Sequence, residues 1–183
     1  MVNETKRCIR EGMISLLREK EYSEIQMKEI AQRSNVGRRT LYRYFENKEL
    51  IIKYIAESLM DHFAEEIEKE ETMTLYTVIL AFFAFVKNNR MEFMILKKAR
   101  LLSFIEDRLP ELIAGVAAKT KYKGRSAAEV PFLGVPVPAG DKYYFYFVFA
   151  GFWRVAIAWI EEDEALSPEK MAEITLKIMS GER

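Results

Sequence analysis

Residues 25 to 50 read IQMKEIAQRSNVGRRTLYRYFENKEL, and this stretch determines the fold expected for the whole chain. Met27, Ile30 and Ala31 fall on one face of a short helix, because an α-helix brings positions three and four apart together. The polar residues that follow predict a tight turn, and Asn35 suits the left-handed backbone conformation that such a turn requires. The stretch therefore begins as a short helix followed by a sharp change of direction.

A second helix is expected after the turn. Leu41 and Phe45 lie four positions apart, so both can dock on the first helix. The opposite face carries only basic, aromatic and polar side chains, with no acidic residue between Gly37 and Phe45. Two short helices of this kind have the format of a helix-turn-helix that places its second helix in the major groove of DNA.

These residues resemble the DNA-binding domain of the TetR family, whose pattern ends in Thr-hydrophobic-Tyr-x-His/Tyr-Phe-x-x-Lys-Glu-x-Leu. The matching positions are Ile30, Ala31, Val36, Thr40, Leu41, Tyr42, Tyr44, Phe45, Lys48, Glu49 and Leu50. The chain departs from the family pattern at Gln26, where Thr is usual, at Asn35, where Gly is usual, and at Gly37, where Ser is common. The hydroxyls missing at Gln26 and Gly37 put the phosphate contacts usual at these two positions in doubt.

The resemblance implies a homodimer that binds a palindromic or pseudo-palindromic site on double-stranded DNA. We expect Arg38 and Arg39 to read base edges, since an arginine fork reaches O6 and N7 of guanine. Thr40, Tyr42, Tyr44 and Lys48 are expected to contact phosphates. The complete predicted DNA-binding set is Gln26, Met27, Gly37, Arg38, Arg39, Thr40, Tyr42, Arg43, Tyr44 and Lys48.

Composition fits this interpretation. The chain has 183 residues, of which 50% are apolar and 31% charged, and its net charge of zero excludes a generally basic surface. The first 50 residues carry a basic excess and the remainder an acidic one. A single cysteine excludes an intrachain disulfide, and with no signal peptide at the start it indicates the cytoplasm.

An enzyme is not expected. One histidine and one cysteine cannot form a His/Cys metal site, and the sequence has neither a phosphate-binding glycine loop nor a nucleophile elbow. Pairs of carboxylates do occur, but acid-rich helices produce such pairs by chance. We therefore expect no metal and no cofactor.

The predicted fold is all-α with two domains. Residues 1–47 form a three-helix helix-turn-helix domain, and residues 48–183 form a helical domain for dimerisation and effector binding. Ser167-Pro168 predicts the start of the last helix through N-cap and N1 chemistry. Further helices are expected at about 48–70, 73–88, 92–106, 110–121 and 143–160.

The segment from Tyr143 to Ile160 is nearly all apolar and close to the length of a membrane span. Arg154 lies well inside it, which argues against a span and for a helix covered on one side by its own domain and on another by a partner or ligand. In the TetR family the last two long helices form the dimer interface. The resemblance thus implies an interface at Phe152, Ala156, Trp159, Met171, Ile174 and Ile178, although small residues such as Ala156 also suit an ordinary core.

The TetR resemblance also implies an effector cavity in the C-terminal domain. Aromatic residues cluster there, and although such stripes are more often core than pocket, they could hold a small apolar molecule that releases the DNA. The predicted ligand-binding set is Phe82, Phe85, Arg100, Phe104, Tyr146, Phe149 and Trp153. The apolar loop 122–140 either covers this cavity, touches the partner subunit or packs on the core. The function that the resemblance implies is a transcriptional repressor released by such a ligand. The alternative is a DNA-binding regulator, repressor or activator, that is controlled by a protein partner.

Overall fold

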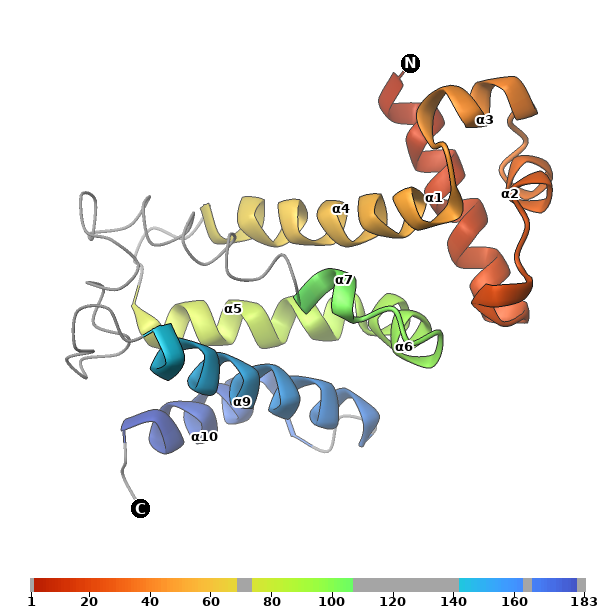
Figure 1. Cartoon of the computed structure of the whole chain (residues 1–183). Helices are drawn as coiled ribbons and strands as arrows, with labels where there is room; N and C mark the ends of the chain where they lie inside the picture. Colours follow the sequence, from red (N-terminus) through yellow and green to blue (C-terminus); the bar gives the residue numbers. More distant parts are fainter. Residues whose placement is uncertain (1, 69–73, 107–141, 163–165, 181–183) are drawn as a thin grey trace. The chain divides into compact units, whose positions relative to one another are not determined.

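A computed structural model describes residues 2–68, 74–106, 142–162 and 166–180, and within these ranges every element is helical (Figure 1). The predicted all-α class is therefore confirmed. The chain is divided into two compact units. The first comprises Met1–Asp61 with Met91–Arg108, and the second comprises His62–Arg90 with Leu109–Arg183. The predicted helix at 110–121 and the loop 122–140 lie outside the described residues.

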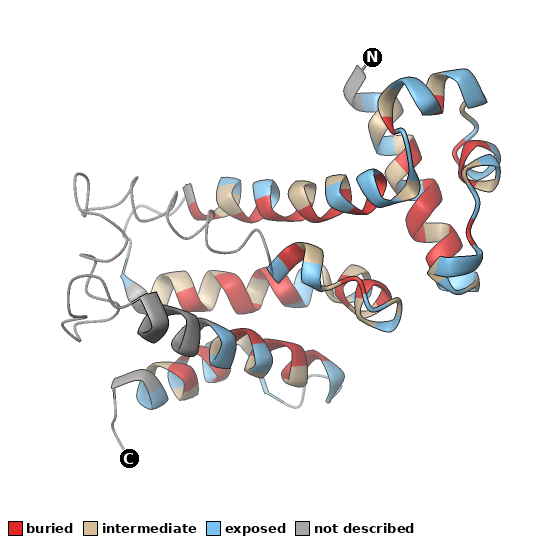
Figure 2. Cartoon of the chain, in the orientation of Figure 1, coloured by how far each residue is buried: buried red, intermediate tan, exposed pale blue. Residues whose placement is uncertain are grey.

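The first unit begins with α1 (Val2–Glu19), the short 3-10 helix η1 (Tyr22–Glu24), α2 (Met27–Arg33) and α3 (Arg38–Tyr44). Its core comes from the apolar residues that recur at helical spacing, and complete burial of each such side chain contributes roughly 1.5 to 3 kcal/mol. Buried and exposed residues alternate along α1 accordingly (Figure 2). The core side chains are Ile9, Met13, Leu16, Leu17, Ile30, Leu41 and Phe45.

Helix α1 passes very close to the end of α2. A Cβ atom added to Gly12 would lie 3.0 Å from both the Cβ and the backbone nitrogen of Ser34. Arg33 fastens the same end of α2 to α1, because its guanidinium donates to Glu19 at 2.6 and 2.7 Å and to the Ser15 hydroxyl at 2.6 Å. The absence of a side chain at Gly12 thus permits the approach that brings these partners together.

The remainder of the first unit comes from the start of α4 (Lys48–Glu68), most of α6 (Arg90–Lys98), and α7 (Ser103–Glu106). Arg10 of α1 and Glu92 of α6 form an ion pair whose two side chains are each about four-fifths buried. This pair joins elements that are 82 positions apart in the sequence.

The predicted helix at 92–106 is interrupted, which corrects the sequence expectation. Arg100 has a φ of 60°, and its backbone N–H donates to the Lys97 carbonyl at 2.9 Å. The next N–H, of Leu101, donates to the Leu96 carbonyl at 2.8 Å. Such bonds end a helix through a left-handed residue. Because glycine and asparagine are the usual residues in that conformation, an arginine there gave no signal in the sequence.

The second unit contains the end of α4, α5 (Leu75–Asn88), α9 (Lys142–Glu161) and α10 (Pro168–Ser180). Its core is aromatic. Phe82 packs against Phe152 with ring centroids 4.7 Å apart, and Phe83 packs edge-on against Trp159 at 5.3 Å. Each such pair contributes about 0.5 to 1.5 kcal/mol beyond the area that it buries.

Two polar contacts fix the ends of α9 and α10. Trp159 donates its indole N–H to the Leu166 carbonyl at 3.1 Å, and the N–H of Lys170 donates to the Ser167 hydroxyl at 3.3 Å. The second bond confirms the predicted start of α10. None of the helices in the described ranges has the length and apolar composition of a membrane span.

Candidate nucleic-acid interface

The turn between α2 and α3 sets the direction of the second helix. Asn35 has a φ of 53°, which confirms the left-handed conformation predicted for it. The N–H of Val36 reaches back to the Ala31 carbonyl at 2.9 Å, and the Ser34 hydroxyl donates to the Ile30 carbonyl at 2.5 Å. These bonds satisfy carbonyls at the end of α2 that would otherwise lack partners.

Helix α3 is two-sided in the way that the sequence predicts. Leu41 is fully buried and Phe45, just beyond the end of the helix, is 4% exposed, so the apolar side of the helix is docked. The opposite side carries exposed residues at Arg38, Arg39, Tyr42 and Arg43. Within the described part of the chain, neither Arg38 nor Arg39 has an ion pair, so both guanidinium groups are available to a negatively charged partner.

Thr40 and Tyr44 lie at the border of this face and are half-buried. The Tyr44 hydroxyl accepts from Arg43 at 3.4 Å, and the Arg43 guanidinium also lies 5.0 Å from the centre of the Tyr44 ring. Gly37 is the exposed N-cap residue of α3 and has extended backbone geometry.

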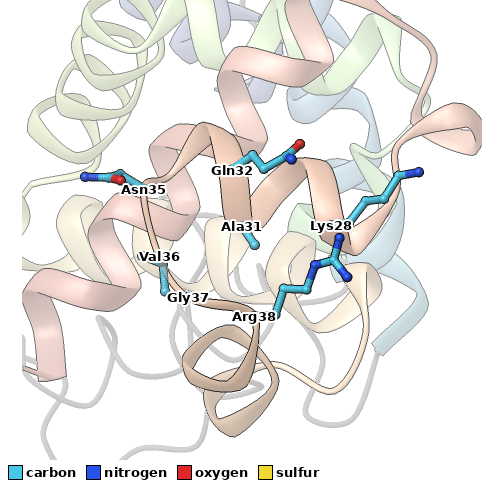
Figure 3. A pocket seen from close by; sticks show the side chains of 7 residues that line it. All are labelled: Lys28, Ala31, Gln32, Asn35, Val36, Gly37 and Arg38. Carbon is cyan, nitrogen blue, oxygen red and sulfur yellow. The ribbon is translucent and has the colours of Figure 1, made fainter.

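A hollow of about 280 Å³ lies between α2 and α3. The side chains of Lys28 and Arg38 extend on the same side of it, while Asn35 lies at its other end (Figure 3). Ala31 and Val36 supply apolar surface. The complete lining is Lys28, Ala31, Gln32, Asn35, Val36, Gly37 and Arg38.

The sequence prediction omitted Lys28, Gln32 and Asn35 from the binding set. They occupy the exposed side of α2 and its turn, at spacings of four and three, opposite buried Ile30. That spacing is a polar stripe of helical period and could have indicated them.

The predicted residues at the start of α2 are Gln26, which is exposed, and Met27, which is half-buried. The N–H of Gln26 donates to the Glu29 carboxylate at 2.9 Å, and Lys20 donates to the same carboxylate at 2.5 Å. These bonds, the one from Lys20 first, hold the pKa of Glu29 below its ordinary value of 4.5. Arg33 lowers the pKa of Glu19 in the same way.

Lys48, for which the sequence predicts a phosphate contact, has backbone partners within its own unit. Its ammonium donates to three backbone carbonyls, those of Tyr22 at 2.6 Å, Ile25 at 3.1 Å and Ser23 at 3.2 Å. The residue is half-buried. The acceptors lie 23 to 26 positions away, so no local pattern in the sequence indicates them.

The predicted ligand-binding residues are divided between the two units. Phe82, Phe85 and Trp153 are buried in the second unit, where the rings of Phe82 and Trp153 have centroids 6.3 Å apart. Arg100 and Phe104 lie in the first unit. The side chains of Tyr146 and Phe149 lie outside the described part of the structure. The structure thus brings Phe82 and Trp153 together in the second unit. Arg100 and Phe104 belong to the first unit.

The predicted dimer residues also form two groups. Ala156, Trp159 and Met171 are each at most 6% exposed in the single subunit, so their side chains leave little surface for a partner. They are core residues because one face of α9 packs within its own unit. Phe152 and Ile174 are half-buried, and Ile178 is 67% exposed. A Cβ atom at Gly151 would meet no heavy atom of the described residues within 4 Å, so among those residues this side of α9 is open.

Among the described residues, no cluster of three or more His, Cys, Asp or Glu side chains could hold a metal ion.

Comparison with known proteins gives a family match for the first part of the chain and a shared fold for almost all of it. Residues 9–55 match the model for bacterial regulatory proteins of the tetR family. The sequence matches none of the proteins whose functions have been curated. The TetR resemblance that residues 25–50 predict is confirmed by the first of these findings together with the structures that follow.

Three solved structures illustrate the shared fold. A TetR-family transcriptional regulator from Syntrophomonas wolfei is 21% identical with a TM-score of 0.70, and the alignment covers 98% of this chain and 95% of that one. FadR from Bacillus subtilis in complex with stearoyl-CoA is 18% identical with a TM-score of 0.67, covering 97% and 98%. The dihydroxyacetone kinase operon activator DhaS is 18% identical with a TM-score of 0.61, covering 97% and 94%.

Proposed function

We propose that this TetR-family transcriptional regulator, which binds DNA, is a repressor that acts as a homodimer and leaves its operator when a small apolar ligand binds. The observation that carries the DNA-binding geometry is the exposed face of α3. It presents Arg38, Arg39 and Tyr42 without a neighbouring acid, on a helix whose other side is docked. Such a face fits the major groove, where an α-helix can reach base edges.

Each contact residue has a distinct role in this proposal. Arg38 and Arg39 read base edges, because they lie at the N-terminal end of α3. The hydroxyl groups of Tyr42, Thr40 and Tyr44 donate hydrogen bonds to phosphates along the border of that face. Lys28, beside Arg38 at the hollow, adds a phosphate contact from α2. Gln26, Met27, Gly37 and Arg43 complete the surface that faces the DNA.

The assignment of residues 1–47 to DNA binding and of residues 48–183 to dimerisation and sensing is part of the same proposal, as is a cytoplasmic location. We infer that dimers form through the outward sides of α9 and α10, at Gly151, Ile174 and Ile178. The support is an exposed apolar side chain at Ile178 of α10 and an open, glycine-containing face of α9.

Support for an apolar ligand comes from the aromatic composition of the second unit and from the stearoyl-CoA bound to the similar FadR structure. The alternative is control by a protein partner, with activation instead of repression. The similarity to DhaS, an operon activator, keeps that alternative open. The proteins with which the fold is shared are regulators and not enzymes.

Selection of duplexes from a random pool by the wild-type protein tests the DNA-binding part, and a two-fold symmetric consensus is expected. Thermal-shift screening of apolar metabolites then tests the ligand. By linkage, a ligand that weakens operator binding about 100-fold must itself bind the free protein about 100-fold more tightly than the DNA complex, a coupling near 2.7 kcal/mol. A screen in which no compound shifts melting, with and without the duplex, favours the protein-partner alternative.

A further inference from the structure

The ion pair between Arg10 of α1 and Glu92 of α6 is largely buried but only partly satisfied. Among the described residues, the Arg10 guanidinium donates one N–H to the Glu92 carboxylate, and its buried Nε–H meets no acceptor. The two side chains are 20% and 22% exposed. An arginine fork can form two parallel bonds to a carboxylate, so this pair uses less than its bonding capacity.

Such a pair is a poor source of stability. Taking two charges out of water costs free energy, and their attraction offsets that cost only when the geometry is good and further hydrogen bonds are made. Replacement of a buried ion pair by apolar side chains is often neutral or stabilising, whereas removal of one partner leaves an uncompensated charge. A role in orientation therefore explains this pair better than a role in stability.

Helix α6 is held at two neighbouring positions. Arg90, its first residue, donates its Nε–H to the Ile160 carbonyl of α9 at 3.1 Å, and both residues belong to the second unit. Glu92, two positions later, belongs to the first unit and holds Arg10. One continuous helix thus carries a side-chain contact in each unit.

Helix α1 extends the contact to the helix-turn-helix. Gly12, on the turn of α1 that follows Arg10, lies against Ser34 at the end of α2. Arg33 of α2 bonds to Glu19 of α1 with two N–H groups. Helix α1, helix α2 and the turn that leads to α3 therefore form one packed body, which Arg10 attaches to α6.

We propose that Arg10 and Glu92 are positioning residues, which set how the helix-turn-helix is held on α6 and contribute little to folding. The inference rests on the proposed function, because a homodimer gains affinity from its second helix-turn-helix only when both can engage their half-sites at once. A helix-turn-helix held at another angle still binds one half-site. Loss of the pair should therefore weaken binding to two half-sites and spare binding to one.

The first test is melting without DNA. Arg10→Met alone should lower the melting temperature by roughly 5 to 15 °C, because Glu92 is left with a buried, unpaired charge. The double methionine variant, Arg10→Met with Glu92→Met, should melt within about 3 °C of the wild type or above it. A folded double variant that melts below Arg10→Met alone would overturn the proposal, since the pair would then stabilise the fold.

The matched control is a second ion pair on α1. Arg7 and Glu11 are bonded at 3.1 Å, with side chains 58% and 55% exposed. Arg7→Met with Glu11→Met removes the same two charges from an exposed place, so melting should change by no more than about 2 °C.

The second test compares two duplexes at fixed salt. One is the duplex selected by the wild type, with both half-sites, and the other has one half scrambled. The double methionine variant should bind the full duplex about 10- to 100-fold more weakly than the wild type does, and the half-site duplex within about two-fold of it. The Arg7 and Glu11 control should keep the wild-type ratio of the two affinities.

Two binding results would overturn the proposal. A double methionine variant with the wild-type ratio would show that the pair does not position the helix-turn-helix. Equal losses on both duplexes would show damage within the helix-turn-helix itself. If the double variant does not fold, Glu92→Gln carries the binding test, because it removes one charge and keeps the size. It should lower the ratio at least about three-fold, and an unchanged ratio would overturn the proposal.

The wild type separates this inference from the proposed function. If the wild type binds the full duplex no better than the half-site duplex, the proposed homodimeric function fails and this inference fails with it. If the wild type gains affinity from the second half-site and the double methionine variant gains as much, only this inference fails.

Discussion

Six cations of the helix-turn-helix region form two sets, according to what their side chains contact. The anchored cations are Lys20, Arg33 and Lys48, each bonded to a carboxylate or to backbone carbonyls of its own domain. The exposed cations are Lys28, Arg38 and Arg39, for which the described part of the chain contains no ion pair. Anchored cations contribute to folding, whereas exposed cations can release counterions when they meet phosphates.

Arg39→Ala should weaken binding to the selected duplex by about 1 to 3 kcal/mol and relax preference at one base position in each half-site. The reason is its place near the N-terminal end of α3. Lys28→Ala should weaken selected and scrambled duplexes alike and reduce the salt slope by about 0.9. Titration of both variants at fixed salt checks this contrast. Equal losses on both duplexes for Arg39→Ala would assign it to phosphate and not to a base.

Glu29→Gln should make the domain less stable at neutral pH and should matter less in acid. The folded-state pKa of Glu29 is lowered, chiefly by the bond from Lys20. Its contribution is therefore complete above the unfolded-state pKa near 4.5 and is lost as the pH falls through the lower folded value. The melting temperatures of the wild type and the variant should converge as the pH drops below that value. A constant difference down to about pH 3, or the same behaviour in the exposed Glu24→Gln, would contradict this account.

The packing of α1 against α2 depends on one missing side chain. Gly12→Ala improves helix propensity by about 1 kcal/mol, but its methyl would press on the backbone of Ser34, which cannot move independently of the turn. We expect a net destabilisation of about 1 to 3 kcal/mol, because overpacking a close crossing forces the backbone to shift. Denaturant unfolding measures it, with exposed Arg18→Ala as the control on the same helix. A stabilised Gly12→Ala would show that the two helices can separate without cost.

Helices were predictable where a local signal exists, and their partners were not. Periodic apolar residues predicted the apolar side of α3, Asn35 predicted its own positive φ, and Ser167-Pro168 predicted the start of α10. The break at Arg100 had no signal, because an arginine is an unusual left-handed residue. In α9 the apolar residues surround the helix, so the sequence could not tell which side its own unit covers.

The candidate interface shows the same limit. The basic side of α3 was visible in the sequence because all of its residues lie within one short helix. The place of Lys48 depends on carbonyls in a distant turn, and carbonyls are common to every residue type. Its contacts therefore follow from the tertiary structure alone, and the Tyr-Phe-x-x-Lys pattern identifies the lysine without identifying its partner.

Assembly of two subunits should depend on residues that the single subunit leaves uncovered. Ile178→Glu should shift the protein from dimer to monomer in sedimentation at micromolar concentration, because a charge in an apolar interface loses its water. The subunit should stay folded, since Ile178 is 67% exposed. Met91→Glu is the matched control, with a wild-type side chain 61% exposed in the other unit. A wild type that is already monomeric, or an Ile178→Glu dimer, would exclude this side of α10 from the interface.

The separation of anchored from exposed cations has a consequence for how such a protein can diverge. A duplicated regulator acquires a new operator only through substitutions that alter its contacts with bases while the domain still folds. Substitution of Arg38 or Arg39 breaks no ion pair in the described part of the chain, so these positions can vary without loss of such contacts. Exchanging Arg33 or Lys48 removes bonds that hold helices together. Under the proposed function, the domain therefore contains a surface that can evolve with its DNA site and a framework that descendants must inherit intact.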